Sequence, residues 1–235
     1  MSDRTRNVGR EIPRRGGVSD HRADVRGVPA DVRPGGRRPQ RAGGAGLWRR
    51  RRGVHRGGGR TRGRAVAADP LYGPPAATLE PELSAAVETN VAQLREKRDL
   101  FVWDVYGDVE TRGRYLRAAT ERFLADYAAN PGRYVAAAVP SLPFVAGAFD
   151  LALVANLLFL YDDRLDLAFH LAAVRELVRV AGEVRVFPLS SLDATRSVLV
   201  DPFVDRLRAD GLSARFESVP YEFQPGATEM LVVTA

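Results

Sequence analysis

The composition of the chain changes abruptly at about residue 64, and this change limits where a folded domain can lie. Residues 1–64 contain 19 arginines and 5 acidic residues, a net charge of +14, together with 14 of the 22 glycines. The remaining residues carry 16 basic and 24 acidic side chains, a net charge of −8, and the two parts add up to the +6 of the whole chain. The basic character therefore belongs to the N-terminal quarter alone.

Residues 1–63 show no apolar period of two or of 3.6 residues and few large apolar side chains. A segment of this composition cannot bury enough surface to offset its chain entropy, so we expect it to be disordered. Its arginines could contact nucleic-acid phosphates. Trp48, however, stands without the aromatic series that stacks on bases. We therefore expect only non-specific nucleic-acid binding through residues 1–64.

From residue 64 onward, apolar runs that suit strands alternate with helical patterns. The expected strands are 64–69, 134–139, 149–155, 183–187, 212–216 and 230–234. The expected helices cover 78–94, 116–127, 167–178 and 201–207, and the last two end at Gly182 and Gly211. This alternation predicts an α/β, Rossmann-like, mostly parallel sheet with helices on both faces. Only Pro220 to Thr228 separate the last two strands, so we expect them to form an antiparallel hairpin.

The length of 235 residues suits one α/β domain, which we expect at 64–235, with a helical insertion at about 71–132. The absence of cysteine excludes disulfide scaffolds, zinc–thiolate sites and thiol chemistry. No apolar run reaches the roughly 18–20 residues of a membrane span, and the N-terminus lacks the apolar core of a signal peptide. We therefore expect a cytoplasmic location and no membrane partner.

Two segments of this region resemble a known family. Leu142-Pro143-Phe144, followed by Phe149-Asp150 and an apolar run, resembles the entry to the fourth strand of class I S-adenosylmethionine-dependent methyltransferases. Residues 176–182 resemble the helix and glycine turn before that family's fifth strand. The resemblance covers about residues 64–235. It implies S-adenosyl-L-methionine as cofactor and methyl transfer to an acceptor that the sequence leaves unidentified.

The resemblance and the expected sheet indicate four cofactor-binding residues. Asp69 resembles the acid at the end of the family's second strand, which hydrogen-bonds the ribose hydroxyls of the cofactor. Ser141 and Leu142 are expected at the carboxyl edge of the sheet, where open sheets bind ligands, as is Asn156. As alternatives, Asp69 only caps the turn at Pro70, and Asn156 is only a polar cap. The catalytic base remains unassigned, and the transfer needs no metal.

Three other groups of residues could have purely structural roles. His170 lies near the apolar stripe of the helix at 167–178, and we expect it to be packed. The acids at 162–166 suit a helix N-terminus better than a metal site. Three aromatic residues of the insertion could either line a substrate pocket or dock the insertion: Phe101, Trp103 and Tyr106.

The family's fold begins with a strand and a glycine-rich loop that leads into a helix, and the loop's backbone binds the cofactor. The corresponding residues here, 43–59, contain glycines but no recognisable strand, and they include Arg49–Arg52. Suitable codons for Gly46–Arg52, shifted by one base, encode aspartate, cysteine and a run of glycines. We therefore hypothesise that residues from about 10 to 63 are translated out of frame, and we expect cofactor binding to be impaired.

Two alternative functions remain open. A nicotinamide-binding Rossmann protein would share the acid that ends the second strand. The Tyr-x-x-x-Lys pair that many of those enzymes use is absent, since Gln93 lies four residues before Lys97. The other alternative is a non-catalytic pseudoenzyme or a nucleic-acid-binding protein that acts through its Arg-rich N-terminus.

Overall fold

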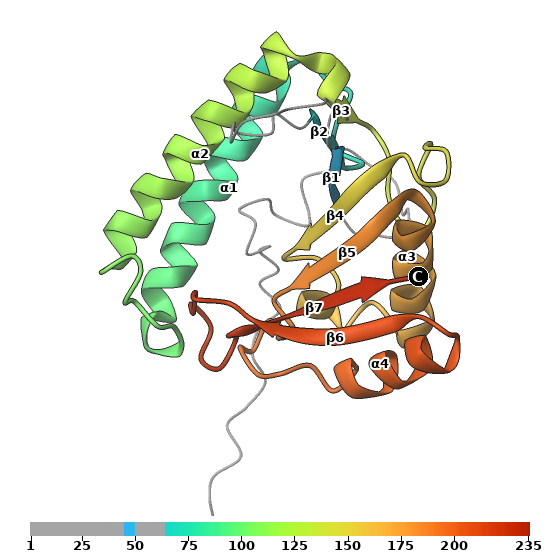
Figure 1. Ribbon diagram of the computed structural model, residues 1–235. Helices are drawn as coiled ribbons and strands as arrows, with labels where there is room; N and C mark the ends of the chain where they lie inside the picture. Colours follow the sequence, from blue (N-terminus) through green and yellow to red (C-terminus); the bar gives the residue numbers. More distant parts are fainter. Residues whose placement is uncertain (1–44, 50–63) are drawn as a thin grey trace, which may run out of the picture.

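A seven-stranded sheet organises the computed structural model, which describes residues 45–49 and 64–235 (Figure 1). Its strands are β1 (Ala45–Arg49), β2 (Arg64–Ala68), β3 (Tyr134–Val135), β4 (Phe149–Ala155), β5 (Ala181–Phe187), β6 (Ser213–Ser218) and β7 (Glu229–Thr234). They lie in the order β3-β2-β1-β4-β5-β7-β6. Strand order reverses between β1 and β4, which makes this position the switch point of a doubly wound sheet.

The described helices are α1 (Ala76–Glu96), α2 (Val109–Ala129), α3 (Leu167–Val180) and α4 (Val200–Ala209). Short 3-10 turns occupy residues 98–100, 131–133 and 159–161. Within the described residues, no helix combines the length and the apolar character that crossing a membrane requires.

Most of the strands run in one direction. β2 and β3 pair in parallel, as do β4 and β5, whereas β1 is antiparallel to both β2 and β4. β7 is antiparallel to both β5 and β6. It follows that β2, β3, β4, β5 and β6 share one direction and that β1 and β7 run the other way. The expected α/β class with a mostly parallel, Rossmann-like sheet is confirmed.

The expected terminal hairpin is confirmed as well. β6 and β7 pair from Ser213↔Thr234 to Ser218↔Glu229. The N–H of Val219 extends the ladder by donating to the carbonyl of Thr228 at 2.8 Å. The connection at 219–228 is too short for a crossover helix, so the two strands have to be antiparallel.

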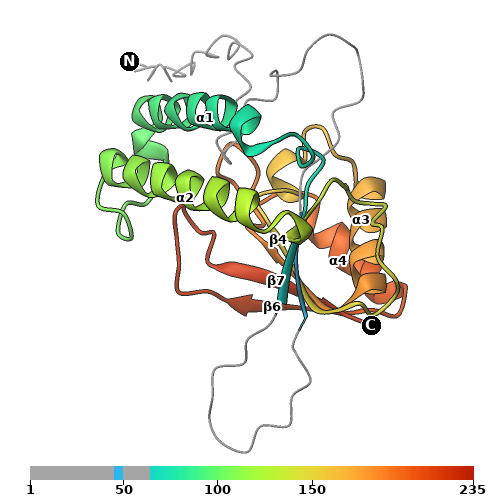
Figure 2. The same cartoon turned by 90° about the horizontal axis from the view of Figure 1, so that it is seen from above.

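One face of the sheet carries both α3 and α4 (Figure 2). Side chains alternate between the two faces along a strand. On this face Ala152, Val154 and Val184 are buried in one cluster with Leu177 of α3 and Phe203 of α4. This cluster is the main hydrophobic core of the domain.

The opposite face carries no helix from the described parts of the chain. Leu153 of β4 points to it and is 45% exposed, although its neighbours Ala152 and Val154 are buried. Toward β6 this face carries four charged residues from β5 and β6 that form ion pairs with one another: Glu183, Arg185, Arg215 and Glu217. Of the helices expected on both faces of the sheet, the described residues therefore place α3 and α4 on one face.

Two element boundaries differ from the expected ones. β3 ends at Val135 instead of continuing to 139, because Val135 pairs with Ala68, the last residue of β2. α3 continues to Val180 and passes directly into β5, so Gly182 does not end the helix. A Cβ atom at position 182 would lie 3.4 Å from the Asp150 carbonyl oxygen, at the limit of ordinary van der Waals contact.

The N-terminal strand also departs from expectation. Residues 1–63 were predicted to be disordered and 43–59 to lack a strand, yet Ala45–Arg49 form β1. Leu47 is only 1% exposed, since it lies between Val66 and Ala152 on the face that carries the helices. Residues 1–44 and 50–63 lie outside the described residues, as does most of the segment for which a shifted frame is hypothesised.

The α1–α2 pair, residues 76–129, lies on the side of the sheet where β4 and β5 end (Figure 1). At one end of the pair, the Tyr134 hydroxyl of β3 donates to Oδ2 of Asp126 at 2.6 Å. Burial and this hydrogen bond raise the pKa of Tyr134 to about 12. At the other end, the N–H of Val102 donates to the carbonyl of Phe223 in the β6–β7 loop at 2.8 Å. We call this pair, attached at both ends, the helical bridge.

Candidate functional site

The candidate site is the carboxyl edge of the sheet next to the switch point. Open α/β sheets bind ligands in the crevice outside this edge. Asp69 directly follows β2, Asn156 directly follows β4, and Phe187 is the last residue of β5. Of the four residues predicted to bind the cofactor, Asp69 and Asn156 therefore lie at the expected edge.

Asp69 caps the turn that follows β2. Its Oδ1 accepts the N–H of Leu71 at 2.9 Å, and its own N–H donates to the carbonyl of Val135 at 3.1 Å. The turn-capping alternative is thus present in the structure. Ribose binding by Asp69 stays a prediction.

Asn156 joins the ends of β4 and β5. Its N–H donates to the carbonyl of Phe187 at 2.9 Å. Its φ of 52° lies in the left-handed region, which asparagine adopts more readily than most residues. The backbone therefore turns sharply at Asn156, at the carboxyl edge of the sheet, and the side chain of this residue is half-buried.

Leu142 lies elsewhere than expected. Its N–H donates to Oε1 of Glu176 at 2.8 Å, and its carbonyl accepts from Nη2 of Arg179 at 3.3 Å. Hydrogen bonding to Arg179 lowers the pKa of Glu176, which keeps this carboxylate ionised. Both partners lie in the last turns of α3, which lead into the amino end of β5. Leu142 and Phe144, whose carbonyl accepts from Arg179 at 2.9 Å, are thus held away from the carboxyl edge.

Ser141 comes directly before Leu142, and its side chain is exposed. Its N–H donates to the carbonyl of Ala138 at 3.0 Å, so the two residues close a turn. The expected position beside Asn156 followed from a strand extending to 139. Because β3 ends at Val135, the intervening residues carry the chain away from that edge.

The reversed direction of β1 decides at which edge of the sheet the chain leaves this strand. Ala45 pairs with Ala68, the residue before Asp69, and Arg49 pairs with Arg64 at the start of β2. The chain therefore leaves β1 at the amino edge of β2, opposite Asp69. In the family that the sequence resembles, the glycine loop after the first strand meets the cofactor at the carboxyl edge. This direction of β1 does not bring a following loop there.

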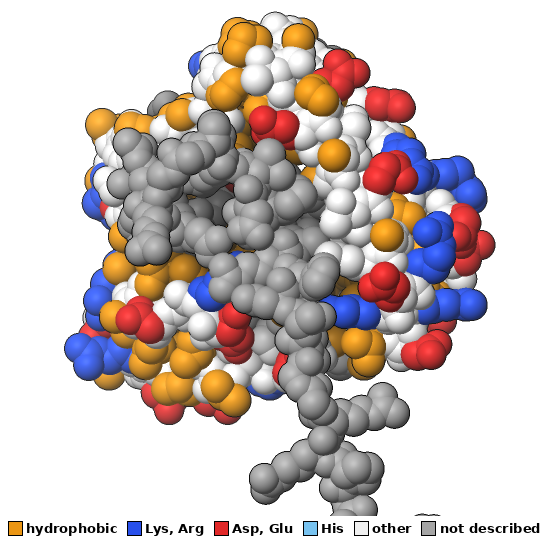
Figure 3. Space-filling view, turned by 180° about the vertical axis from the view of Figure 1, so that it is seen from behind, with side chains coloured by type: hydrophobic (Ala, Val, Ile, Leu, Met, Phe, Trp, Pro, Cys, Tyr) orange, Lys and Arg blue, Asp and Glu red, His pale blue; other side chains and the backbone are white. Residues whose placement is uncertain are grey.

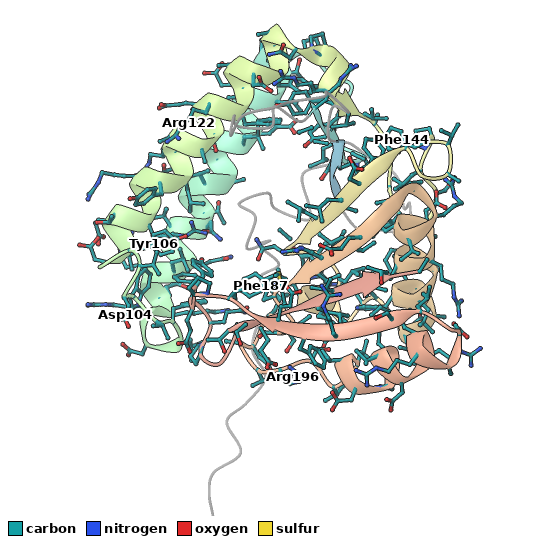
Figure 4. The ribbon with its side chains drawn as sticks, viewed as in Figure 1. Asp104, Tyr106, Arg122, Phe144, Phe187 and Arg196 are labelled. Carbon is teal, nitrogen blue, oxygen red and sulfur yellow. The ribbon has the colours of Figure 1, made fainter. Side chains whose placement is uncertain are left out.

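An aromatic cluster lies where the helical bridge meets the β6–β7 loop, near the carboxyl end of β5 (Figure 4). The ring of Phe223 lies 4.7 Å from that of Phe101, 5.4 Å from that of Trp103 and 5.5 Å from that of Tyr106. Docking, one of the two roles considered for these insertion residues, is therefore confirmed.

Sequence reasoning missed Tyr221 and Arg112, which complete this cluster. The hydroxyls of Tyr106 and Tyr221 lie 3.2 Å apart, and Nη1 of Arg112 donates to the Tyr106 hydroxyl at 3.1 Å. The Tyr221 ring lies 6.0 Å from the ring of Phe187. Burial, together with the hydrogen bond to Tyr106, raises the pKa of Tyr221. The contact of Tyr106 with Tyr221 joins residues 115 positions apart, which no local sequence pattern indicates.

His170 is a core residue, as expected. It is 0% exposed, its Nδ1 lies 2.7 Å from the Asp166 carbonyl oxygen, and its ring lies 5.1 Å from that of Phe159. Asp166 caps α3 by accepting the N–H of Phe169 at 2.8 Å, which confirms the helix-start role for this acid, whereas Asp162 ends the preceding 3-10 turn. The described residues contain no group of three or more His, Asp or Glu side chains placed to hold a metal ion.

Burial of His170 predicts a pH dependence of stability. Desolvation lowers the pKa of His170 below its ordinary value of 6.5, so the unfolded chain takes up this proton first as the pH falls. Its contribution to the free energy of unfolding is complete above about pH 6.5 and decreases as the pH falls below that value. Urea denaturation between about pH 7.5 and about pH 5 should show a shallower pH slope for His170→Leu than for the parent chain. Equal slopes would contradict this prediction.

The charges on the outer side of the helical bridge are mixed. Seen from behind, acidic and basic side chains alternate along the margin that the bridge occupies (Figure 3). Arg117 pairs with Glu88 at 2.7 Å and Arg95 pairs with Glu110 at 3.1 Å across the two helices. Such interspersed charges do not form the single-sign surface that contacts a phosphate backbone.

Comparison with known proteins finds a relative that matches part of the chain. No protein-family model matches the chain, and no solved structure matches it. An uncharacterized protein of Methanocaldococcus jannaschii is 29% identical over 133 residues, which cover 57% of this chain and 58% of that protein. The chain thus spans less than two thirds of this relative's length.

Proposed function

We propose that the chain has the scaffold of a class I S-adenosylmethionine-dependent methyltransferase and that its function is methyl transfer to an acceptor at the carboxyl edge of β4 and β5. The strand order carries this proposal. A doubly wound sheet has its switch point between β1 and β4, and here the reversed β7 lies between β5 and β6. This arrangement agrees with the terminal hairpin of the family that the sequence resembles.

The described residues at the carboxyl edge suit the ribose part of the cofactor. Asp69 stands at the end of β2, where a carboxylate would accept hydrogen bonds from ribose hydroxyls, and Asn156 stands at the same edge of the sheet at the end of β4, with β1 between the two strands. The cofactor would supply the methyl group, and transfer of this kind depends mainly on positioning the two reactants. The reversed β1 does not fit, because its following loop starts at the other edge. We therefore expect impaired transfer in the chain as printed.

The reversed β1 also supports a second candidate, a non-catalytic pseudoenzyme with the same scaffold. The two functions differ in one measurable property, since a methyltransferase has to bind S-adenosylmethionine in the Asp69 region. A nicotinamide cofactor would use the same acid, so NAD should be titrated in parallel.

Replacing Asp69 tests the proposed site. In a version of the chain whose codons for residues 10–63 are read in the shifted frame, Asp69→Ala should weaken S-adenosylmethionine binding by about 10- to 100-fold, as expected for loss of a hydrogen-bonding carboxylate. Isothermal titration measures this effect. Asp205→Ala, on the exposed side of α4, is the matched control and should leave the affinity unchanged. Equal affinities of the two variants would remove Asp69 from the site, and tighter binding of NAD would favour the nicotinamide alternative.

A further inference from the structure

Arg112 is half-buried, whereas the other arginines of the helical bridge, which are at 95, 98, 114, 117 and 122, are exposed. Arg95 and Arg117 form ion pairs across the two helices. Arg112 forms none within the described residues, although it is half-buried. Its guanidinium lies 4.5 Å from the centre of the Tyr106 ring and 5.4 Å from that of Phe223. Cation–π contacts of this kind offset only part of the cost of desolvating a cation.

Two further features make the position unfavourable for an unpaired cation. Arg112 lies in the first turn of α2, where the helix dipole is positive and disfavours a second positive charge. Its Nε is buried and has no hydrogen-bond partner in the described part of the chain. A buried donor without a partner is costly. An anion bound at the outer nitrogens of Arg112 would remove the first of these disadvantages by neutralising the charge.

A continuous series of contacts connects Arg112 to the carboxyl edge. The N–H of Asn156 donates to Phe187, the Phe187 ring contacts the Tyr221 ring, and the Tyr221 hydroxyl reaches Tyr106, which accepts from Arg112. Figure 4 shows Tyr106 on the helical bridge and Phe187 at the end of β5. Arg112 therefore lies on the bridge side of the site proposed for methyl transfer.

We propose that Arg112, with the hydroxyls of Tyr106 and Tyr221, binds an oxyanion group, carboxylate or phosphate, of the methyl acceptor. The planar guanidinium suits both groups because it donates two parallel hydrogen bonds. The surrounding aromatic rings limit solvent screening of the ion pair. One of the two tyrosine hydroxyls donates to the other at 3.2 Å, which leaves one hydroxyl proton of the pair to donate to the anion. The identification of the ligand as the acceptor rests on the proposed function, whereas anion binding by Arg112 does not.

Small aryl anions test this subsite in the chain as printed, without any cofactor. Benzoate and phenyl phosphate are titrated separately, with benzyl alcohol as the neutral probe. The readout is the NMR shift of the Trp103 indole N–H, which donates to the Arg98 carbonyl at 2.9 Å beside the cluster. The parent for all variants carries Trp48→Phe, so that the spectrum contains a single indole signal. At least one of the two anions should bind with a dissociation constant of about 1 mM, as expected for a ligand of this size, and benzyl alcohol more weakly.

Three variants separate binding by Arg112 from general charge effects. Arg112→Met should weaken anion binding at least tenfold. Arg117→Met, which removes an equal charge from the same helix, should leave binding unchanged. Arg112→Lys should give an intermediate affinity, because lysine keeps the charge and loses the planar fork. The circular dichroism spectrum and the Trp103 shift of each free variant report whether the bridge is intact. If Arg112→Met does not fold, the comparison of Arg112→Lys with Arg117→Met decides the result.

The results overturn the proposal if no Arg112-dependent shift occurs up to about 20 mM anion, if benzyl alcohol binds as tightly as the anions, or if Arg117→Met weakens binding as much as the change at Arg112. Binding of carboxylate only, or of phosphate only, supports the proposal and identifies the group on the acceptor. Failure of S-adenosylmethionine binding combined with Arg112-dependent anion binding would remove the methyltransferase proposal and keep the subsite. Binding of S-adenosylmethionine without Arg112-dependent anion binding would remove the subsite and keep the methyltransferase proposal.

Discussion

S-adenosylmethionine is expected to bind the chain as printed several powers of ten more weakly than a version whose codons for residues 10–63 are read in the shifted frame. The cofactor's ribose and carboxylate need backbone donors from a glycine loop that is fixed by a strand before it and a helix after it. Loss of about four hydrogen bonds, at about 1 kcal/mol or more each, corresponds to a factor of about a thousand or more in affinity.

The direction of β1 gives this expectation a structural reason. A parallel first strand would deliver its following loop next to Asp69, whereas β1 delivers it next to Arg64 at the other edge. Isothermal titration of the two chains measures the difference, and reading the gene in all frames across codons 8–65 tests the frame hypothesis independently. Comparable micromolar binding by the chain as printed would show that the frame hypothesis, or the position assigned to the loop, is wrong.

Phe223→Ala should detach one end of the helical bridge. The Phe223 side chain is only 6% exposed and contacts the rings of Phe101, Trp103 and Tyr106. Truncation of a buried phenylalanine costs about 3–5 kcal/mol, and we expect this loss mainly in the docking of residues 98–112. Hydrogen exchange should show reduced protection of these residues, and of α1 and α2, while β4 and β5 keep theirs.

Leu100→Ala is the control, since Leu100 lies at the same end of the bridge and is 48% exposed. It should change the free energy of unfolding by no more than about 0.5 kcal/mol. Equal loss of protection in the bridge and in the sheet of Phe223→Ala would show that the two form one cooperative unit.

The sequence predicted the elements whose residues are consecutive and periodic. β4 was predicted at its observed bounds because Phe149-Asp150 leads into the uninterrupted apolar run 151–155, and the terminal hairpin followed from a short connection. β1 could not be predicted, since Leu47 becomes a core residue only through pairing with two distant strands. β3 was predicted to be too long, because its end depends on where its partner β2 ends.

In the candidate site, too, the sequence predicted the positions that depend on consecutive residues and missed those that depend on distant contacts. The positions of Asp69 and Asn156 follow from strand ends, which the sequence marks. Leu142 was misplaced, because its position is set by Glu176 and Arg179 of a later helix. Tyr221 reaches Tyr106, the hydrogen-bond partner of Arg112, only through the attachment of the bridge to the β6–β7 loop, which the sequence of either segment does not indicate.

The attachment of the helical bridge at both ends has a consequence for how the bridge can move. A lid fixed at one end can swing as a rigid body about its hinge. The bridge is held to β3 through the bond of Asp126 to Tyr134 and to the β6–β7 loop through Phe223. A swinging motion would first have to separate one of these contacts. With both intact, the described bridge is a span fixed at its two ends, and release of the Phe223 end would leave it hinged at β3 alone.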